Sequence, residues 1–233
     1  MPGPVLTVIL ADAEVELVPQ DIAGHPAIRE PARVAGRKPT EMLLDQNSHG
    51  AAMGRMTDGK RRGRPDIVHY CLLTLLESPL CKAGGLRVSV HTRHGELVQV
   101  RSDTRLPRGE ARFQGLLAKV LREGASHDKQ PLLWSEGQAG PADILAKMAR
   151  GPVVRLDEGG TPLAPARLAE LGQDLTVVLG AFPSGGFSEA WLAAAPEAVS
   201  LWPEPLNAWA VAGEVVAAHR AKWGPEQPAK PQP

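Results

Sequence analysis

The chain has 233 residues, of which 43% are hydrophobic, enough for one large domain or two small ones with a buried core. Its 26 basic and 26 acidic residues balance, so the net charge does not indicate a nucleic-acid partner, although a local cluster of charge can still bind one. The apolar runs are short and no signal pattern opens the chain, which predicts a soluble cytoplasmic protein without a membrane anchor.

The cysteines and histidines do not indicate a metal site or a catalytic triad. Cys71 and Cys81 lie in or beside an apolar helical run and have no partners at metal-ligand spacing. We expect buried, reduced thiols and no metal ion. His49, His69 and His91 lack the neighbours of a triad, so we expect them to be structural.

The N-terminal half predicts a strand, a long loop, a buried helix and a hairpin. Residues 4–19 open with a dense apolar run that is typical of a strand buried on both faces. Residues 19–40 are rich in proline, glycine and charge, which predicts a loop with little regular structure. A basic loop at about 54–64 precedes a nearly all-apolar helix over about 65–76, and residues 85–105 alternate like a β-hairpin.

The C-terminal half predicts further helices and two strands that end in unusual loops. Pro107 opens a helix with one apolar stripe, whereas 124–150 is irregular apart from a weak helix near "ADILAKMA". The stretch "DLTVVLGAFPSGGFS" predicts a buried strand that runs into a glycine-rich loop. A short strand then leads through a proline-bounded loop to a helix capped by Asn207.

Strands that alternate with helices predict an α/β fold with a largely parallel sheet. A small inserted β-rich subdomain is expected around the hairpin at about 85–105. We expect a single domain over residues 1–222 and a disordered tail at 223–233.

Three arginines surround the start of the first helix after the hairpin. Arg108 and Arg112 are four residues apart and share a helix face, and Arg105 lies just before the helix. The arginine fork fits phosphate oxygens, so this set predicts contacts with a nucleic-acid backbone. The alternative is a solvated rim whose arginines pair with Asp103 and Glu110.

The basic loop before the buried helix carries a second set of arginines, Arg61, Arg62 and Arg64. Asp66, two residues after Arg64, can hold that guanidinium in place and reduce the entropy lost on binding a partner. The alternative is an ordinary ion pair at a helix terminus. Together, the two sets of arginines predict a track for a phosphate backbone.

Two loops follow buried strands near the C-terminus, where α/β sheets hold small ligands. Gly180, Gly185 and Gly186 allow a ligand to approach the backbone closely. Their spacing is neither a dinucleotide fingerprint nor a P-loop, which disfavours a dinucleotide and ATP. The two prolines of "SLWPEPL" predict an extended loop that can present unpaired backbone groups to a flat ring, although an ordinary connection explains it as well.

Several long blocks in one order resemble a known family, the pseudouridine-N1 methyltransferases of small-subunit ribosomal RNA, which also act in ribosome assembly. The blocks, which cover about 43–121 and 175–210, are "LLDQNSH", "RRGRPDIVHYCLLTLLESPL", "LRVSVHTRHGELVQVRSDTRLPRGEARFQGLLAKVL", "VVLGAFPSGGFS" and "VSLWPEPLNAW". This family belongs to the SPOUT superfamily of α/β-knot methyltransferases, and the compact length is similar to that of its archaeal members.

The resemblance implies a SPOUT-type α/β knot whose C-terminal segment threads a trefoil knot, a homodimer, and S-adenosyl-L-methionine as the methyl donor. It also implies an acidic residue where this chain has Gly186. By similarity, the cofactor is held by two loops and one residue outside the matching blocks: Gly180, Gly185, Leu201, Trp202, Pro203, Glu204, Pro205, Leu206 and Leu156.

On the RNA side, the resemblance gives roles to the arginines already described. Arg64, Arg105, Arg108 and Arg112 match family arginines that contact rRNA. Asp66 matches the carboxylate that steadies the first of them. The partner implied is therefore small-subunit rRNA.

The implied activity is methylation of N1 of a pseudouridine in a loop of small-subunit (16S-type) rRNA, with a role in small-subunit assembly. Asp45 and Asp66 are the candidates for a general base. One alternative is a non-catalytic rRNA-binding assembly factor that keeps the pocket, but the presence of both cofactor loops favours catalysis. Another is a SPOUT methyltransferase with a different RNA target, against which the blocks "RRGRPDI" and "TRLPRGEARF" argue.

Overall fold

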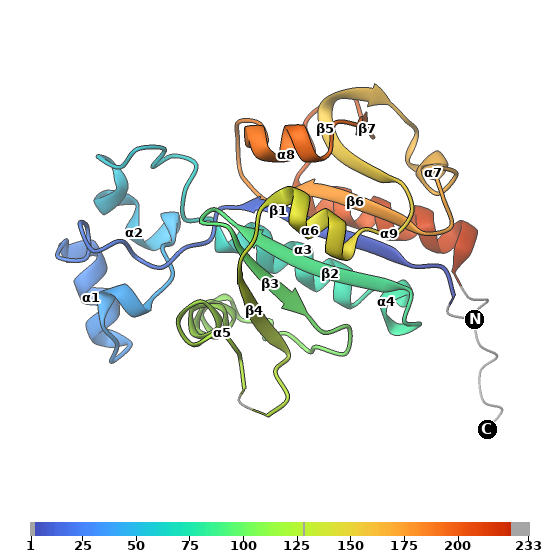
Figure 1. Ribbon diagram of the computed structural model, residues 1–233. Coiled ribbons are helices and arrows are strands. Elements are labelled where there is room, and N and C mark those ends of the chain that lie inside the picture. The colour runs from blue at the N-terminus through green and yellow to red at the C-terminus, as the bar shows by residue number, and fades with distance from the viewer. Residues whose placement is uncertain (1–2, 128, 225–233) are drawn as a thin grey trace.

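The computed structural model describes residues 3–127 and 129–224, which form one mixed sheet of seven strands with helices on both faces (Figure 1). The strands are β1 (Leu6–Ala13), β2 (Leu86–Thr92), β3 (Glu96–Val100), β4 (Leu133–Gln138), β5 (Val153–Pro162), β6 (Leu175–Gly180) and β7 (Ala198–Ser200). The helices are α1 (Pro26–Val34), α2 (Gln46–Met53), α3 (Pro65–Leu76), α4 (Pro79–Lys82), α5 (Glu110–Glu123), α6 (Pro141–Met148), α7 (Pro165–Leu168), α8 (Glu189–Ala194) and α9 (Ala208–Trp223). None of these helices is long and apolar enough to cross a membrane. Most of the tail predicted at 223–233 lies outside the described residues.

The strands lie in the order β4-β3-β2-β1-β6-β5-β7. Strands β2, β1, β6, β5 and β7 are parallel, and β3 and β4 extend one edge in the antiparallel direction. The largely parallel sheet is therefore confirmed, and so is the hairpin between β2 and β3. The hairpin is continuous with the central sheet and is not a separate inserted subdomain, because β2 pairs with β1 as well as with β3.

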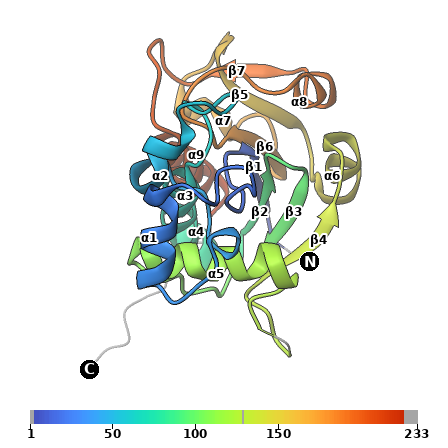
Figure 2. The same ribbon diagram turned by 90° about the vertical axis from the view of Figure 1, so that its left-hand side faces the viewer.

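Strand β1 lies near the centre of the sheet and is buried on both faces, as its apolar run predicts (Figure 1, Figure 2). Leu6, Val8 and Leu10 belong to the large core with α3, α5 and α9. Ile9 and Ala11 belong to a second cluster with α6 and α8 on the opposite face. A parallel strand covered by helices on both sides has no polar face, so its sequence does not alternate.

Residues 19–40 contain a helix where a loop was expected. Helix α1 begins at Pro26, and Nδ1 of His25 accepts a hydrogen bond from the N–H of Ala27 over 3.1 Å. Ile28 is fully buried in a small cluster with Leu44 and Met53, so α1 packs on α2 beside the main sheet (Figure 2). Proline at the first helical position favours this start, which the high proline and charge content concealed.

The region around residues 107–150 is more regular than its sequence indicates. The stretch at 124–150 supplies β4 and α6, and α6 confirms the weak helix expected at "ADILAKMA". The helix expected to open at Pro107 instead begins at Glu110, with Gly109 as its N-cap. Arg108 therefore precedes the helix, and it does not share a helical face with Arg112.

Both cysteines are free and buried, as expected. Burial, with the nearby Asp66 carboxylate, raises the pKa of the Cys71 thiol from 9.0 to about 12. At pH 8 only about one molecule in 10,000 then carries the reactive thiolate. We expect a thiol reagent such as DTNB to leave Cys71 unmodified in the folded protein at pH 8, and to modify both cysteines at once in guanidinium chloride. Rapid modification of two thiols under native conditions would contradict this burial.

Candidate active site

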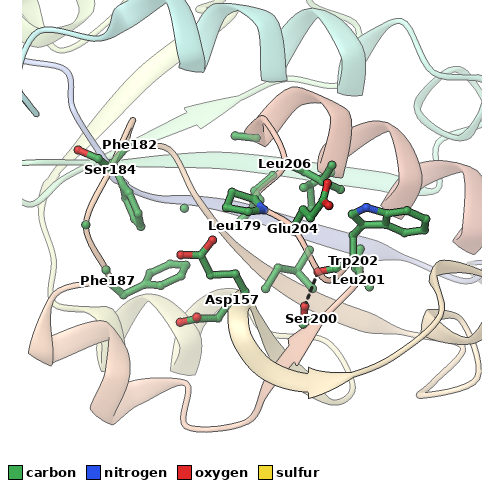
Figure 3. Close-up of a pocket in the computed structure, with 18 of the residues that line it drawn as sticks. Asp157, Leu179, Phe182, Ser184, Phe187, Ser200, Leu201, Trp202, Glu204 and Leu206 are labelled. Carbon is green, nitrogen blue, oxygen red and sulfur yellow. Dashed lines mark hydrogen bonds between the residues drawn. The ribbon is translucent and has the colours of Figure 1, made fainter.

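A cavity of about 480 Å³ opens beyond the carboxyl ends of β6 and β7, beside the middle of β5 (Figure 3). Its walls come from three segments, residues 156–158, 179–187 and 199–211. In Figure 3, Phe182 and Phe187 lie on one side of this space and Trp202 on the other, with Asp157 between them. A cavity of this size fits a ligand the size of a nucleoside with a side chain.

Of the nine residues predicted to hold a cofactor, eight line this cavity, and Pro203 does not. The glycine-rich loop, the proline-bounded loop and Leu156 are therefore brought together from distant parts of the chain. Sequence reasoning missed two acidic residues of β5, Asp157 and Glu158, which also line the cavity. They lie in the stretch that the family resemblance did not cover, so no motif indicated them.

The glycine-rich loop of residues 181–187 has a tightly constrained shape. A Cβ on Gly180 would lie 2.7 Å from the ring of Phe182, so a side chain there would displace the ring. The rings of Phe182 and Phe187 meet edge to face, with centroids 5.2 Å apart. Gly185 has φ +79°, a left-handed conformation that side chains disfavour.

Both ends of this loop are attached to β1 and the residues that follow it. The N–H of Ala181 donates to the carbonyl of Ala11 (2.9 Å), and the N–H of Glu14 donates to the carbonyl of Ala181 (3.2 Å). At the other end, the Asp12 carboxylate accepts the N–H and the hydroxyl of Ser188 (2.7 and 3.1 Å). Asp12 has φ +47°, and such conformations in non-glycine residues are concentrated at functional sites.

The proline-bounded loop forms the opposite wall. The hydroxyl of Ser200 donates to the carbonyl of Trp202 over 2.8 Å, which closes a tight turn (Figure 3). Among the described residues, the N–H groups of Trp202, Glu204 and Leu206 have no hydrogen-bond partner. Unpaired amides beside a cavity are available to a ligand, as expected for this loop.

The composition of the cavity wall limits what can bind there. Leu156, Leu179 and Leu201 offer apolar surface on which a flat ring can lie. Asp157, Glu158 and Glu204 give the wall negative charge, and no lysine or arginine lines the cavity among the described residues. A ligand with an aromatic ring and positive charge therefore fits better than a nucleotide phosphate.

On a different surface, Arg64 and Asp66 form the expected pair at the N-terminus of α3. Nε and Nη2 of Arg64 donate to the two carboxylate oxygens of Asp66 over 2.8 and 2.7 Å. The side chains are 24% and 14% exposed, so the guanidinium is held but still reaches solvent. This geometry is that of an arginine fixed in orientation before a partner arrives.

Arg61 and Arg62, the other two arginines of this set, pair with buried carboxylates instead. Arg61 pairs with Glu14, and Arg62 donates two hydrogen bonds to Glu16 over 2.7 and 2.6 Å. Both carboxylates are at most 2% exposed. Arg61 and Arg62 are therefore held by buried carboxylates, and Arg64, whose partner Asp66 itself reaches solvent, is the member of this set placed to contact a phosphate.

The Glu16 ion pair should contribute to stability in a pH-dependent way. Burial alone would raise the pKa of Glu16, but hydrogen bonds from Arg62 and His94 outweigh it and lower the pKa below 4.5. The stabilisation is therefore complete above pH 4.5 and is lost as the pH falls through the lowered pKa. We expect Glu16→Gln to reduce the free energy of unfolding at pH 7 by about 1–3 kcal/mol and to flatten its decline in acid.

Chemical denaturation between pH 3 and 7 tests this expectation. Glu30→Gln is the matched control, because Glu30 pairs with Arg33 on the exposed surface of α1 and should contribute little. Equal behaviour of the two variants would contradict the role given to Glu16.

The second set of arginines lies beside α3. Nε2 of His69 lies 2.8 Å from the carbonyl oxygen of Pro107, which joins α3 to the segment that carries Arg105 and Arg108. After the dominant hydrogen bond from Lys82, these two arginines also lower the pKa of Glu77 at the C-terminal end of α3. Arg64 thus lies at the start of α3, and the segment that carries Arg105 and Arg108 is joined to α3 through His69.

The alternative for these arginines was a rim in which they pair with Asp103 and Glu110. This alternative is wrong, because both carboxylates have other partners. Asp103 pairs with Arg101, and Glu110 accepts a hydrogen bond from Gln114. Among the described residues, Arg105, Arg108 and Arg112 form no ion pair, and all three are exposed. Unpaired, exposed arginines are free to bind phosphates.

Asp45, the other candidate base, has a structural position. It caps α2 and accepts hydrogen bonds from the N–H of Asn47 (2.9 Å), the hydroxyl of Ser48 (3.2 Å) and Nε2 of Gln114 (3.2 Å). Neither Asp45 nor Asp66 is among the described residues that line the cavity. The structure therefore brings neither carboxylate into the cavity itself.

Comparison with known proteins identifies the family. The model of the EMG1/NEP1 methyltransferase family matches residues 8–220. The ribosomal RNA small subunit methyltransferase Nep1 of Thermococcus kodakarensis is 41% identical over 223 residues, which is 94% of this chain and 99% of that protein. The protein of the same name from Methanothrix thermoacetophila is 35% identical over 211 residues, 91% of this chain and 93% of that protein.

The fold agrees with a solved structure of the same family. The crystal structure of Archaeoglobus fulgidus Nep1 bound to S-adenosylhomocysteine matches with a TM-score of 0.81 and 35% identity, covering 94% of this chain and 98% of that one. The α/β fold expected from the resemblance is confirmed by this match and by the mixed sheet. Because the family model and these relatives span nearly the whole chain, the protein belongs to the EMG1/NEP1 methyltransferase family.

Proposed function

We propose that the protein transfers a methyl group from S-adenosylmethionine to N1 of a pseudouridine in a loop of small-subunit rRNA, during assembly of the subunit in the cytoplasm. The observation that carries this proposal is that one chain holds both a cavity suited to the cofactor and a set of arginines suited to RNA. A cavity with an apolar and acidic wall lies at the ends of β6 and β7, and arginines that reach solvent lie at the start of α3 and in and before the first turn of α5. The names of the relatives, which describe methylation of small-subunit rRNA, support it.

The cavity fits S-adenosylmethionine by its chemistry. The apolar side chains of Leu156, Leu179 and Leu201 would contact the adenine ring, and the free amides of the proline-bounded loop would hydrogen-bond its edge. The carboxylates of Asp157 and Glu204 would favour a positively charged ligand. The S-adenosylhomocysteine bound to the Archaeoglobus relative supports this use of the cavity.

The arginines would hold the RNA loop by its backbone. Arg64 is the N-cap of α3 and Arg112 lies in the first turn of α5, and Arg105 and Arg108 lie in the segment before α5 that contacts α3 through Pro107. Phosphate contacts on both sides of a base would fix the loop while the base leaves its stack and enters the cavity. A single-stranded loop makes this step least costly.

The reaction requires alignment and the loss of one proton. S-adenosylmethionine supplies a methyl group activated by positively charged sulfur. Pseudouridine is joined to its sugar through carbon, so its N1 carries a proton. As the N–CH₃ bond forms, the carbon–sulfur bond breaks, S-adenosylhomocysteine leaves, and the N1 proton passes to solvent water. The chain would hold N1 in line with the carbon–sulfur bond, and the RNA loop held by the arginines would fix the base at that distance. We assign Asp66 to positioning Arg64 and Asp45 to capping α2.

We further propose that the protein is a homodimer and that its C-terminal segment forms the trefoil knot of SPOUT proteins. Support for the dimer comes from exposed apolar side chains on α3 and on the proline-bounded loop. Tyr70 on α3 is 45% exposed and contacts Trp209 on α9, and Trp202 and Leu206 are 55% and 43% exposed. Sedimentation equilibrium should give twice the 24.8 kDa mass of one chain. A monomer at micromolar concentration would overturn this proposal.

A methyl-transfer assay tests the proposed activity. Purified protein and labelled S-adenosylmethionine are mixed with two RNA hairpins that differ only in having uridine or pseudouridine in the loop. We expect label in the pseudouridine hairpin alone. Binding of both hairpins without incorporation into either would favour the alternative, a non-catalytic assembly factor.

A further inference from the structure

Arg61 lies between the basic loop and the wall of the cofactor cavity. Its Nη1 atom donates to the carbonyl oxygens of Ser184 and Gly186, each over 2.9 Å. Its guanidinium carbon lies 4.2 Å from the centre of the Phe182 ring. These three partners, Phe182, Ser184 and Gly186, belong to the glycine-rich loop, line the cavity and are more than 120 positions away in the sequence.

The same side chain is fixed at its other end. Nε of Arg61 donates to Glu14, which is 2% exposed and lies directly after β1. The backbone N–H of Arg61 donates to the carbonyl of Asp58 over 2.7 Å, inside the basic loop. Arg64 is bonded to the same residue, since the backbone N–H of Arg64 donates to the carbonyl of Glu14 over 2.8 Å. Arg61 and the RNA-facing Arg64 are therefore both connected to Glu14.

From these contacts we propose that Arg61 is a positioning residue that couples RNA binding to cofactor binding. This inference rests on the proposed function. RNA bound to Arg64 would order the basic loop, and the ordered loop would keep Arg61 in contact with Ser184, Gly186 and Phe182. Those contacts hold the cavity wall in its binding shape, so each ligand favours binding of the other.

The neighbouring arginine provides a matched control. Arg62 lies in the same loop and makes an equivalent pair with a buried carboxylate, Glu16. Among the described residues, its only other side-chain hydrogen bond goes to the carbonyl of Thr57 in the basic loop. Arg62 therefore shares the chemistry of Arg61 without contacting the cavity wall.

The measurement is the affinity for S-adenosylhomocysteine with and without the pseudouridine hairpin. In the unchanged protein we expect the hairpin to raise this affinity by about fivefold or more, and S-adenosylhomocysteine to raise hairpin affinity by the same factor. In Arg61→Lys the two affinities should become independent, because lysine cannot donate to both carbonyls while lying on the ring. Arg62→Lys should retain the coupling.

The ratio of the S-adenosylhomocysteine affinities measured with and without the hairpin separates loss of coupling from simple damage to the fold, because damage to the fold lowers both affinities. Arg93 also pairs with Glu14, over 3.0 Å, so this carboxylate keeps a partner in Arg61→Lys. Phe182→Leu leaves Arg61 intact but removes the ring on which its guanidinium lies, so this variant should also weaken the coupling. Full coupling in Arg61→Lys, or none in the unchanged protein when both ligands bind, would overturn the inference. Failure of the hairpin to bind at all would overturn the RNA role and the coupling with it.

Discussion

Arg64→Ala should weaken binding of the pseudouridine hairpin by roughly ten- to hundredfold and leave the affinity for S-adenosylhomocysteine unchanged. The variant loses charged hydrogen bonds to phosphate, which contribute about 1.5–3 kcal/mol. It also removes one phosphate contact, so the slope of log affinity against log salt should fall by about 1. Titrations of labelled hairpin at several salt concentrations measure both quantities.

Asp66→Asn separates the charge of Arg64 from its orientation. The guanidinium stays, but it loses the two charged hydrogen bonds, of 2.8 and 2.7 Å, that hold it. We expect a smaller loss of hairpin affinity, about three- to tenfold, with an unchanged salt slope. Glu30→Gln on α1 is the control, because it removes the carboxylate from a similar but exposed pair, Arg33–Glu30. An equal loss in the control would mean that the effect does not come from the orientation of Arg64.

Gly185→Ala should reduce the affinity for S-adenosylhomocysteine by about tenfold or more. The residue has φ +79°, where a side chain costs about 1–2 kcal/mol. A Cβ there would also lie 2.7 Å from Nη1 of Arg61, so it would displace the guanidinium from the loop it holds. Isothermal titration of the two proteins with S-adenosylhomocysteine measures the difference.

Gly186→Ala is the matched control for this prediction. A Cβ on Gly186 has no heavy atom within 4 Å, and the family resemblance implies an acidic side chain at this position. We therefore expect at most a twofold change. If Gly185→Ala and Gly186→Ala weakened binding equally, the effect would be general crowding of the cavity and not the displacement of Arg61.

The parts of the fold that the sequence predicted are those where one local pattern decides the structure. The apolar run of β1, the nearly all-apolar α3 and the strand before the glycine-rich loop are each specified by residues next to one another. Helix α1 was missed because its proline and charge content favours a loop, and only packing of Ile28 in a separate cluster makes the helix stable. The trefoil knot stays a prediction.

The same limit explains what could be predicted of the site. Contiguous blocks indicated the glycine-rich loop, the proline-bounded loop and the Arg64–Asp66 pair. The sequence could not show that Arg61 and Arg62 turn inward, because their partners Glu14 and Glu16 lie 47 and 46 positions away. Counting charge in a loop does not reveal which charges are neutralised by distant residues.

The central claim is that the methyl group is transferred to N1 of pseudouridine, and the position of the methyl group tests it most directly. The pseudouridine hairpin is incubated with protein and S-adenosylmethionine, digested to nucleosides, and compared by chromatography and mass spectrometry with synthetic 1-methyl- and 3-methylpseudouridine. We predict a single product that co-elutes with 1-methylpseudouridine. A methyl group on N3 or on the ribose would contradict the proposed alignment of the base in the cavity.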